Sequence, residues 1–290
     1  MNQWRTLRDY LRGYGHDATS MRKEHMTIGL TKDTVGDVLR HWRRRRRFSQ
    51  LDLALAADVS TRHISFVESG RSSASRGLLL RLAEHLALPL RERNHLLLAG
   101  GYAPQFPERP LDAPDMTAAI EAVRAVLAAY EPFPALAVDR HWTLVAANDA
   151  LSPLLVGVAP HLLEAPVNVL RLSLAPDGLA PSILNFGEWR HHILERLRRD
   201  VAVSGDLAVE RLHDELRRIA SPVARASPPQ LDLRVAVPLI LRHPTTGERL
   251  SFLSTTTVFG TATDVSLAEL TLEGFLPADD ATRKALAGTA

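Results

Sequence analysis

A short stretch of the chain, residues 60–66, brings together hydroxyl, guanidinium, imidazole and phenyl groups. The guanidinium of Arg62 can donate two parallel hydrogen bonds to a planar pair of acceptors, and the ring of Phe66 can make an apolar contact. In the major groove of DNA, guanine offers such a pair of acceptors and thymine offers a methyl group. These residue types are therefore suited to reading base edges, provided that the segment is a helix that enters the groove.

Apolar residues at helical spacing predict five short helices between residues 34 and 99. Thr34, Ser49 and Ser60 are candidate N-caps of the first three helices, because their hydroxyl groups can accept hydrogen bonds from free backbone N–H groups. The fourth helix is expected to end before Pro89, and the fifth to occupy residues 90–99.

The second and third helices are joined by only two residues, Asp58 and Val59. Such a short connection is typical of a helix-turn-helix, in which two helices cross at a steep angle. The turn needs a residue that tolerates a positive φ angle, which Asp does better than most residues, and Ala54 is small enough for the helices to approach closely. A third helix in the major groove would present its N-terminal residues and one further turn to the bases.

Residues 49–71 resemble the helix-turn-helix of the Cro/repressor, or xenobiotic-response-element, family. The shared pattern is Ser-Gln at the second helix, Ala and Val spacers, and a final Ile-x-x-Val-Glu-x-Gly-Arg. Asp58 replaces the usual Gly, and Leu51 and Leu55 stand where polar residues are usual. The resemblance implies a phosphate contact by Gln50 and backbone contacts from the loop after the third helix. The predicted DNA-contacting residues are Gln50, Ser60, Thr61, Arg62, His63, Phe66, Arg71 and Ser72.

Several of these positions also have structural explanations. Arg62 and His63 could be solvated helix residues, and Phe66 could complete a small core. The five arginines at 43–47 cover the whole circumference of a helix, so at most two or three can contact phosphate and one must lie along apolar surface. A nuclear-localisation signal is a weaker alternative for this run.

The chain has 290 residues, a length typical of about two domains. Its formal charge of +2 is divided unevenly, because residues 1–110 carry 19 Lys and Arg against 11 Asp and Glu, a balance of +8, and residues 111–290 carry −6. The absence of cysteine excludes disulfides, Cys-zinc sites and thiol catalysis. The sequence contains neither an apolar run of about 18 residues nor the apolar core of a signal peptide, so we expect a cytoplasmic protein that makes no membrane contact.

The second part of the chain mixes helix and strand patterns. Helices are predicted at residues 118–129 and 206–219, and helical or loop-helix segments at 151–158, 162–170 and 182–201. A hairpin is predicted at 134–148, and further strands at 231–241, 250–259 and 267–275. The fold class is therefore a two-domain one. An all-α helix-turn-helix domain of about five helices (33–103) precedes an α+β, PAS-like domain (118–290) with an antiparallel sheet of about five strands. Residues 1–32 are expected to form a flexible tail, and the Gly- and Pro-rich residues 104–117 a linker.

The chain as a whole resembles the MmyB-like transcription regulators, which join this type of helix-turn-helix to a PAS-like domain. The resemblance spans about residues 34–287 and rests on separated blocks in order. These blocks are residues 90–94, 99–104, 132–140, 145–148, 168–172, 185–190 and 254–261. It implies that the second domain binds a medium- or long-chain fatty acid.

Such a ligand needs a long apolar cavity and a polar anchor for its carboxylate. The candidate ligand-binding residues are Asn148, Arg171, Asn185, Trp189, Arg190 and His192. Structural alternatives exist for three of them: Asn148 could cap a helix, Trp189 could belong to the core, and Arg171 could form a surface ion pair.

A hydrolase or metal enzyme is the rival class, because the chain has 12 histidines and places His191 and His192 shortly before Glu195. The sequence contains no His-Glu-x-x-His, no Gly-x-Ser-x-Gly and no phosphate-binding Gly-rich loop, so we predict no catalytic residues, no metal site and no required cofactor. A second alternative is a scaffold that uses the helix-turn-helix for protein contacts. The prediction is a regulator that binds double-stranded operator DNA as a homodimer and responds to a small apolar carboxylate ligand.

Overall fold

The computed structural model describes residues 33–219 and 236–287. The predicted tail and the first part of the strand expected at 231–241 lie outside the described residues. Backbone contacts divide the described residues into two units. The helical unit comprises residues 33–109 with 261–268, and the sheet unit comprises residues 110–219, 236–260 and 269–287.

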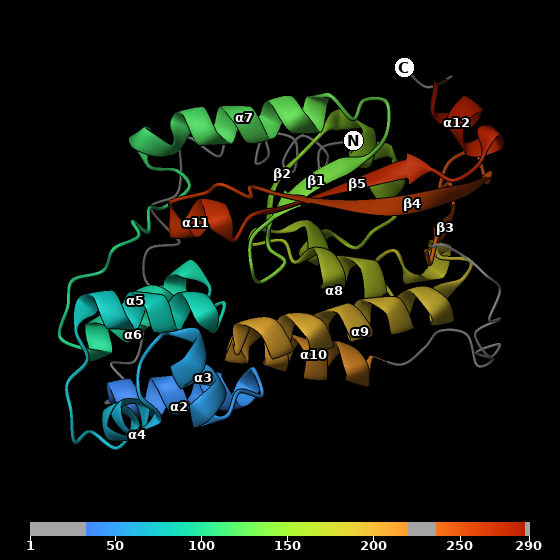
Figure 1. The fold of residues 1–290 in the computed structure, drawn as a ribbon. Helices are drawn as coiled ribbons and strands as arrows, with labels where there is room; N and C mark the ends of the chain where they lie inside the picture. Colours follow the sequence, from blue (N-terminus) through green and yellow to red (C-terminus); the bar gives the residue numbers. More distant parts are fainter. Residues whose placement is uncertain (1–32, 220–235, 288–290) are drawn as a thin grey trace. The chain divides into compact units, whose positions relative to one another are not determined.

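The helical unit contains the five expected helices. They are α2 (Val35–Arg45), α3 (Gln50–Ala56), α4 (Thr61–Glu68), α5 (Arg76–His85) and α6 (Leu90–Ala99) (Figure 1). Thr34 and Ser49 form capping boxes at α2 and α3, and the hydroxyl of Ser60 accepts a hydrogen bond from the backbone N–H of His63 at 3.1 Å. The N-cap predictions from sequence are thus confirmed, because each cap depends only on residues three positions apart.

The connection between α3 and α4 has the geometry that the sequence predicts. Asp58 adopts a φ of 52°, the left-handed conformation for which Gly is usual, and Gly70 ends α4 with a φ of 72°. Ile64 from α4 is completely buried beside Leu53 from α3, and Ala54 is 1% exposed. The two helices therefore pack closely on a shared apolar core.

A segment from far along the chain completes the helical unit. Residues 261–268 include the short helix α11 (Val265–Ala268), which packs against α6. Val265 is completely buried, and its N–H donates to the carbonyl of Pro107 at 2.8 Å. Asn94 on α6 binds the backbone of Gln105 and Phe106, so the first half of the predicted linker belongs to this unit.

The sheet unit is built on five antiparallel strands in the order β2-β1-β5-β4-β3. The strands are β1 (Ala135–Val138), β2 (Leu144–Ala147), β3 (Leu239–Arg242), β4 (Arg249–Val258) and β5 (Thr271–Pro277). The strand predicted at 267–275 begins too early, because Asp264 accepts hydrogen bonds from the N–H groups of Ser266 and Leu267 and starts α11 there. The local cap outweighs the alternating pattern.

Helices lie on both faces of this sheet (Figure 1). They are α7 (Thr117–Ala128), α8 (Val169–Leu174), α9 (Phe186–Ser204), α10 (Leu207–Arg218) and α12 (Asp280–Ala287). Short 3-10 helices occupy Pro114–Met116, Asp149–Leu155, Pro160–Leu163 and Ala180–Ser182. Neighbouring residues of β5 show the two faces: a Cβ on Gly274 would overlap the ring of Tyr130, just after α7, whereas Glu273 binds Arg196 on α9. No helix among the described residues is long and apolar enough to cross a membrane.

Candidate DNA and ligand sites

The outward face of α4 carries the predicted base-contacting residues. Ile64 and Val67 point into the core, whereas Arg62 and Arg71 are exposed and Phe66 is half-buried. The guanidinium carbons of Arg62 and Arg71 lie 5.1 Å and 6.0 Å from the ring centre of Phe66. Phe66 therefore orders two cations at the surface instead of completing a core.

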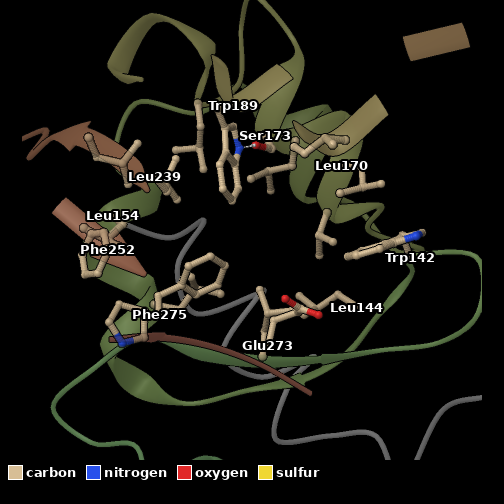
Figure 2. Close-up of a pocket in the computed structure, with 18 of the residues that line it drawn as sticks. Trp142, Leu144, Leu154, Leu170, Ser173, Trp189, Leu239, Phe252, Glu273 and Phe275 are labelled. Atoms are coloured by element: carbon tan, nitrogen blue, oxygen red, sulfur yellow. Dashed lines mark hydrogen bonds between the residues drawn. The ribbon is translucent and has the colours of Figure 1, made fainter. Parts of the chain in front are cut away.

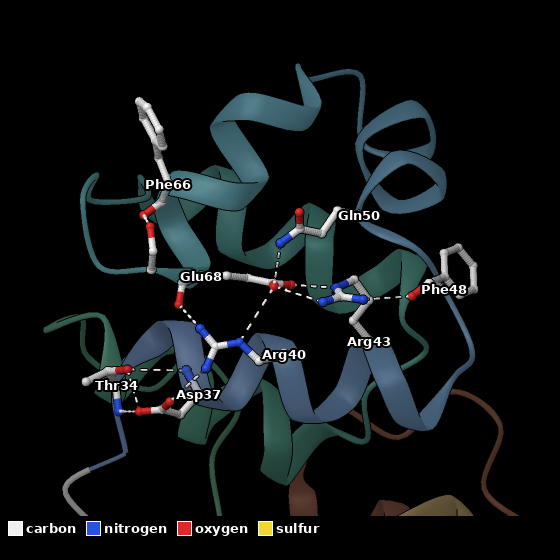
Figure 3. A network of polar contacts seen from close by, with 9 residues as sticks. Thr34, Asp37, Arg40, Arg43, Phe48, Gln50, Phe66 and Glu68 are labelled. Carbon is white, nitrogen blue, oxygen red and sulfur yellow. Dashed lines mark hydrogen bonds and ion pairs between the residues drawn. The ribbon is translucent and has the colours of Figure 1, made fainter.

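Behind α4, a buried polar network fixes the helix against α2 and α3 (Figure 3). The Nε and Nη2 atoms of Arg43 donate to the two carboxylate oxygens of Glu68 at 2.6 Å and 2.9 Å, and Nη1 donates to the carbonyl of Phe48 at 3.0 Å. The amide of Gln50 donates to the same carboxylate at 2.9 Å, and Arg40 donates to the carbonyl of Glu68. Gln50, which is predicted to contact phosphate, is the first residue of α3, and its hydrogen bond to Glu68 fixes the orientation of its side chain.

The ion pair lowers the pKa of Glu68. Burial alone would raise the pKa of this carboxyl group, but hydrogen bonds from Arg43 and Gln50, with the positive charges of Arg43 and Arg40, outweigh that effect. Glu68 therefore stays ionised while its side chain is only 2% exposed. Since it ends α4 and binds α2 and α3, this carboxylate sets the position of the helix that carries Arg62.

The arginine run has both structural and exposed members. Arg43 belongs to the buried network, and Arg46 lies along Trp42, 5.2 Å from its ring centre, while donating to the carbonyls of Leu86 and Ala87. Arg44, in contrast, is exposed. The expectation that one arginine lies along apolar surface is confirmed by Arg46, and the buried ion pair of Arg43 was missed.

The sheet unit contains a cavity between the sheet and helices α8 and α9 (Figure 2). The empty space that it encloses, with the open solvent at its mouth included, is about 1010 Å³. Most of the wall is aliphatic or aromatic, with contributions from Leu144, Leu170 and Phe252. Among the described lining residues, only six carry a polar side-chain atom: Trp142, Ser173, Trp189, His192, Arg196 and Glu273.

The charged groups of this wall form one ion pair. Arg196 donates from Nη2 and Nη1 to the two oxygens of Glu273 at 2.6 Å and 3.1 Å, and its guanidinium carbon lies 4.5 Å from the ring centre of Trp142. Nη2 also donates to the hydroxyl of Thr256 at 3.2 Å. The pKa of His192 is lowered by burial and by the charge of Arg196, so this imidazole is neutral near pH 7.

Family comparisons match both units. The MmyB-like transcription regulator ligand binding domain matches residues 119–288, and a helix-turn-helix domain matches residues 34–96. The chain belongs to the MmyB-like transcription regulators. It is therefore a DNA-binding transcription regulator with a ligand-binding domain, and transcription regulators are usually not enzymes. No curated protein matches the sequence.

Within this MmyB-like regulator, the predicted ligand-binding residues separate into two groups. Trp189 and His192 line the cavity, and the Nε1 atom of Trp189 donates to the hydroxyl of Ser173 at 3.1 Å. The other four do not line it. Arg196 and Glu273 were missed, although Trp189, His192 and Arg196 recur at helical spacing on one face of α9.

The four residues outside the cavity have structural contacts. Asn148 accepts from the backbone of Ala135 at 2.9 Å and donates to the carbonyls of Leu127, at the end of α7, and Phe133. Asn185 binds the backbone at both sides of the start of β3. Arg171 forms an exposed bidentate pair with Glu215, with both distances 2.7 Å. Arg190 donates to the carbonyl of Arg217. Their residue types fitted an anchor, but none of the four lines the cavity, and each makes other contacts.

The part of the chain that the structure describes contains no candidate metal site. No group of three or more His, Asp and Glu side chains lies there in an arrangement that could hold a metal ion. His192 is neighboured by Arg196 and stacks on Trp189 with ring centres 5.4 Å apart. His192, one of the histidines that suggested an enzyme, therefore lies in the wall of an apolar cavity.

Proposed function

We propose that this regulator acts in the cytoplasm as a homodimer of the xenobiotic-response-element type, which binds operator DNA and releases or engages it in response to a fatty-acid-like ligand. The observation that carries the proposal is the apolar cavity with a single charged pair in its wall, within the family's ligand-binding domain. An acyl chain is the simplest ligand with a long apolar body and one polar end.

The DNA side of the proposal rests on the exposed face of α4. Arg62 is available for bidentate contact with guanine, and Phe66 lies beside it with an apolar ring edge for thymine. Arg71 is exposed in the loop that follows the same helix. A phosphate contact from this position would set the register of the protein on the duplex. Two copies related by a two-fold axis would read a palindromic site.

The link between the two activities is supported by chain connectivity. Strands β4 and β5 pair over seven registered residue pairs and carry the cavity residues Phe252, Glu273 and Phe275. Their connection contains residues 261–268, which pack in the helical unit. A ligand that shifts these strands would therefore act on a segment that the DNA-binding unit includes.

The proposal is tested by measuring DNA affinity of the full chain with and without decanoate, on a duplex that the protein selects from a randomised pool. Decanoate should change DNA affinity, and by linkage DNA should change decanoate affinity by the same factor. Leu170→Trp, which adds a large side chain to the cavity wall, should abolish the response while DNA binding remains.

Several outcomes would count against parts of this proposal. Decanoate that binds without changing DNA affinity would remove the coupling and leave a ligand-binding DNA-binding protein. A selected duplex without two-fold symmetry, together with a monomer in sedimentation, would remove the homodimer. Absence of any selected duplex would favour the scaffold alternative.

A further inference from the structure

The cavity wall is electrically balanced. Arg196 is the only Lys or Arg among the described lining residues, and both of its Nη atoms donate to Glu273. Glu273 is 4% exposed, lies in β5, and also accepts from the hydroxyl of Thr256 at 3.1 Å. The cation that could receive a carboxylate is therefore already neutralised by a carboxylate of the protein.

This balance disfavours an ionised head group. A second carboxylate beside Arg196 would place two negative charges against one positive charge, in a cavity with largely apolar walls. Two carboxylates in such proximity do not both remain ionised, because like charges at low dielectric repel strongly, and one of them takes up a proton. A protonated acid, in contrast, can donate its O–H to Glu273 and accept from a donor of the wall.

The other groups near Glu273 do not supply the missing positive charge. On α9, His192 and Arg196 line the cavity. Arg199, farther along the same helix, is exposed and does not line the cavity, and Asp200 is a further carboxyl group. Burial raises the pKa of Asp200, which also receives a hydrogen bond from Trp142. The neighbouring strands contribute Leu136 from β1 and Thr256 from β4, neither of which titrates.

We propose that this cavity takes its ligand with an uncharged, hydrogen-bonding head group, and that a fatty acid therefore binds together with one proton from solvent, with Glu273 as the residue that imposes this requirement. The inference rests on the proposed binding of a fatty-acid-like ligand and specifies the charge state of that ligand. It makes ligand binding by this regulator dependent on pH.

The first test compares decanoate with decanol on the full-length wild-type chain, with binding followed by tryptophan fluorescence, since Trp142 and Trp189 line the cavity. Uptake of one proton predicts that decanoate affinity falls about tenfold for each pH unit between roughly pH 6 and pH 8. Decanol, which is uncharged throughout, should bind equally well over this range. A pH-dependent change in the shape of the cavity would alter both affinities and is thereby controlled.

The second test uses Glu273→Gln, which leaves Arg196 without its anionic partner but retains a side chain of the same shape. Decanoate affinity at pH 8 should rise about tenfold or more over wild type and lose its pH dependence, because Arg196 can then bind the carboxylate directly. The matched control is Glu195→Gln, which removes the same charge from the exposed side of α9, where Glu195 pairs with Arg198. This control should behave as wild type.

The outcomes separate the inference from the function on which it rests. Equal decanoate affinity at pH 6 and pH 8 in wild type would overturn the inference and leave ligand binding intact, and this measurement does not depend on the folding of a variant. An unchanged affinity in folded Glu273→Gln would also overturn it. If neither decanoate nor decanol binds wild type, the proposed ligand class is wrong, and the inference falls with it.

Discussion

Among the residues that the structure describes, each unit of this regulator contains an arginine that pairs with a buried glutamate through two hydrogen bonds. Arg43 and Glu68 make bonds of 2.6 Å and 2.9 Å, and Arg196 and Glu273 make bonds of 2.6 Å and 3.1 Å. The glutamate side chains are 2% and 4% exposed. The pairs differ in what lies beyond them: Gln50 and a backbone carbonyl enclose the first, whereas the second borders a cavity.

The difference shows how one interaction can serve two purposes. An ion pair enclosed by protein contributes little net stability over an apolar substitute, but it is costly to break and therefore fixes the position of α4. The ion pair in the cavity wall has similar bond lengths, but it also faces the polar groups of a ligand that enters the cavity. The first pair determines where the DNA-contacting residues stand, and the second determines which head groups the cavity accepts.

The largest expected effect comes from breaking the enclosed pair. Glu68→Gln leaves Arg43 buried without its counter-charge and should reduce the free energy of unfolding by about 3–5 kcal/mol. Glu273→Gln should cost less, because water can enter the cavity beside Arg196. Urea denaturation of the full chain measures both losses in free energy of unfolding. Equal losses would show that the cavity does not reduce the cost of leaving Arg196 without its partner.

A smaller effect is expected when the enclosed pair is intact and the base-contacting face is changed. Arg62→Ala should weaken binding to the selected duplex by about 1–3 kcal/mol, roughly 5-fold to 150-fold, and relax its sequence preference at one base pair. The control is Arg81→Ala, since Arg81 is an exposed arginine on α5. Loss of affinity without loss of preference would make Arg62 a phosphate contact.

Acid should weaken the helical unit through Glu68. Because the pKa of Glu68 in the folded protein lies below its ordinary value of 4.5, its stabilising contribution is present above about pH 4.5 and is lost as the pH falls through the lowered pKa. At pH 4 only part of the effect of Glu68→Gln should appear. Thermal unfolding of wild type and Glu68→Gln from pH 7 to pH 3 should show curves that converge in acid; parallel curves would contradict the assignment.

The smallest effect concerns the exposed arginines. DNA affinity should fall with rising salt, and Arg71→Ala should reduce the slope of log affinity against log salt concentration by about 1. Stability in urea should stay unchanged, in contrast to the variants of Glu68. A slope equal to that of wild type would place Arg71 away from phosphate.

The sequence predicted best those features that depend on neighbouring residues. Ser49 caps α3 through Asp52, and Asp58 takes the positive φ of the turn, so the helix-turn-helix followed from local chemistry. The family resemblance supplied the type of the second domain, which the family comparison confirms.

The polar centres depend on contacts between distant residues, and here sequence reasoning was weakest. Arg43 and Glu68 are 25 positions apart, and Arg196 and Glu273 are 77 apart. Residue type alone favoured Arg171 as an anchor, because the sequence does not state which side of α8 faces the cavity. The spacing of Trp189 and Arg196 indicates that both lie on one face of α9. It identifies Arg196 as a cavity residue only once the position of Glu273 in the sheet is known.

The segment at 261–268 has a consequence for how such proteins can be recombined. The helical unit is not one continuous piece of chain, because residues 261–268, between β4 and β5, belong to it, and the buried Val265 donates to the carbonyl of Pro107. In a chimera joined within residues 104–117, the helical unit of a relative would have to pack against residues 261–268 of this chain. The helical unit of this chain, moved to another protein, would lose residues 261–268. Exchange of DNA specificity between relatives therefore needs two crossovers, or compensation at the surface that Val265 occupies.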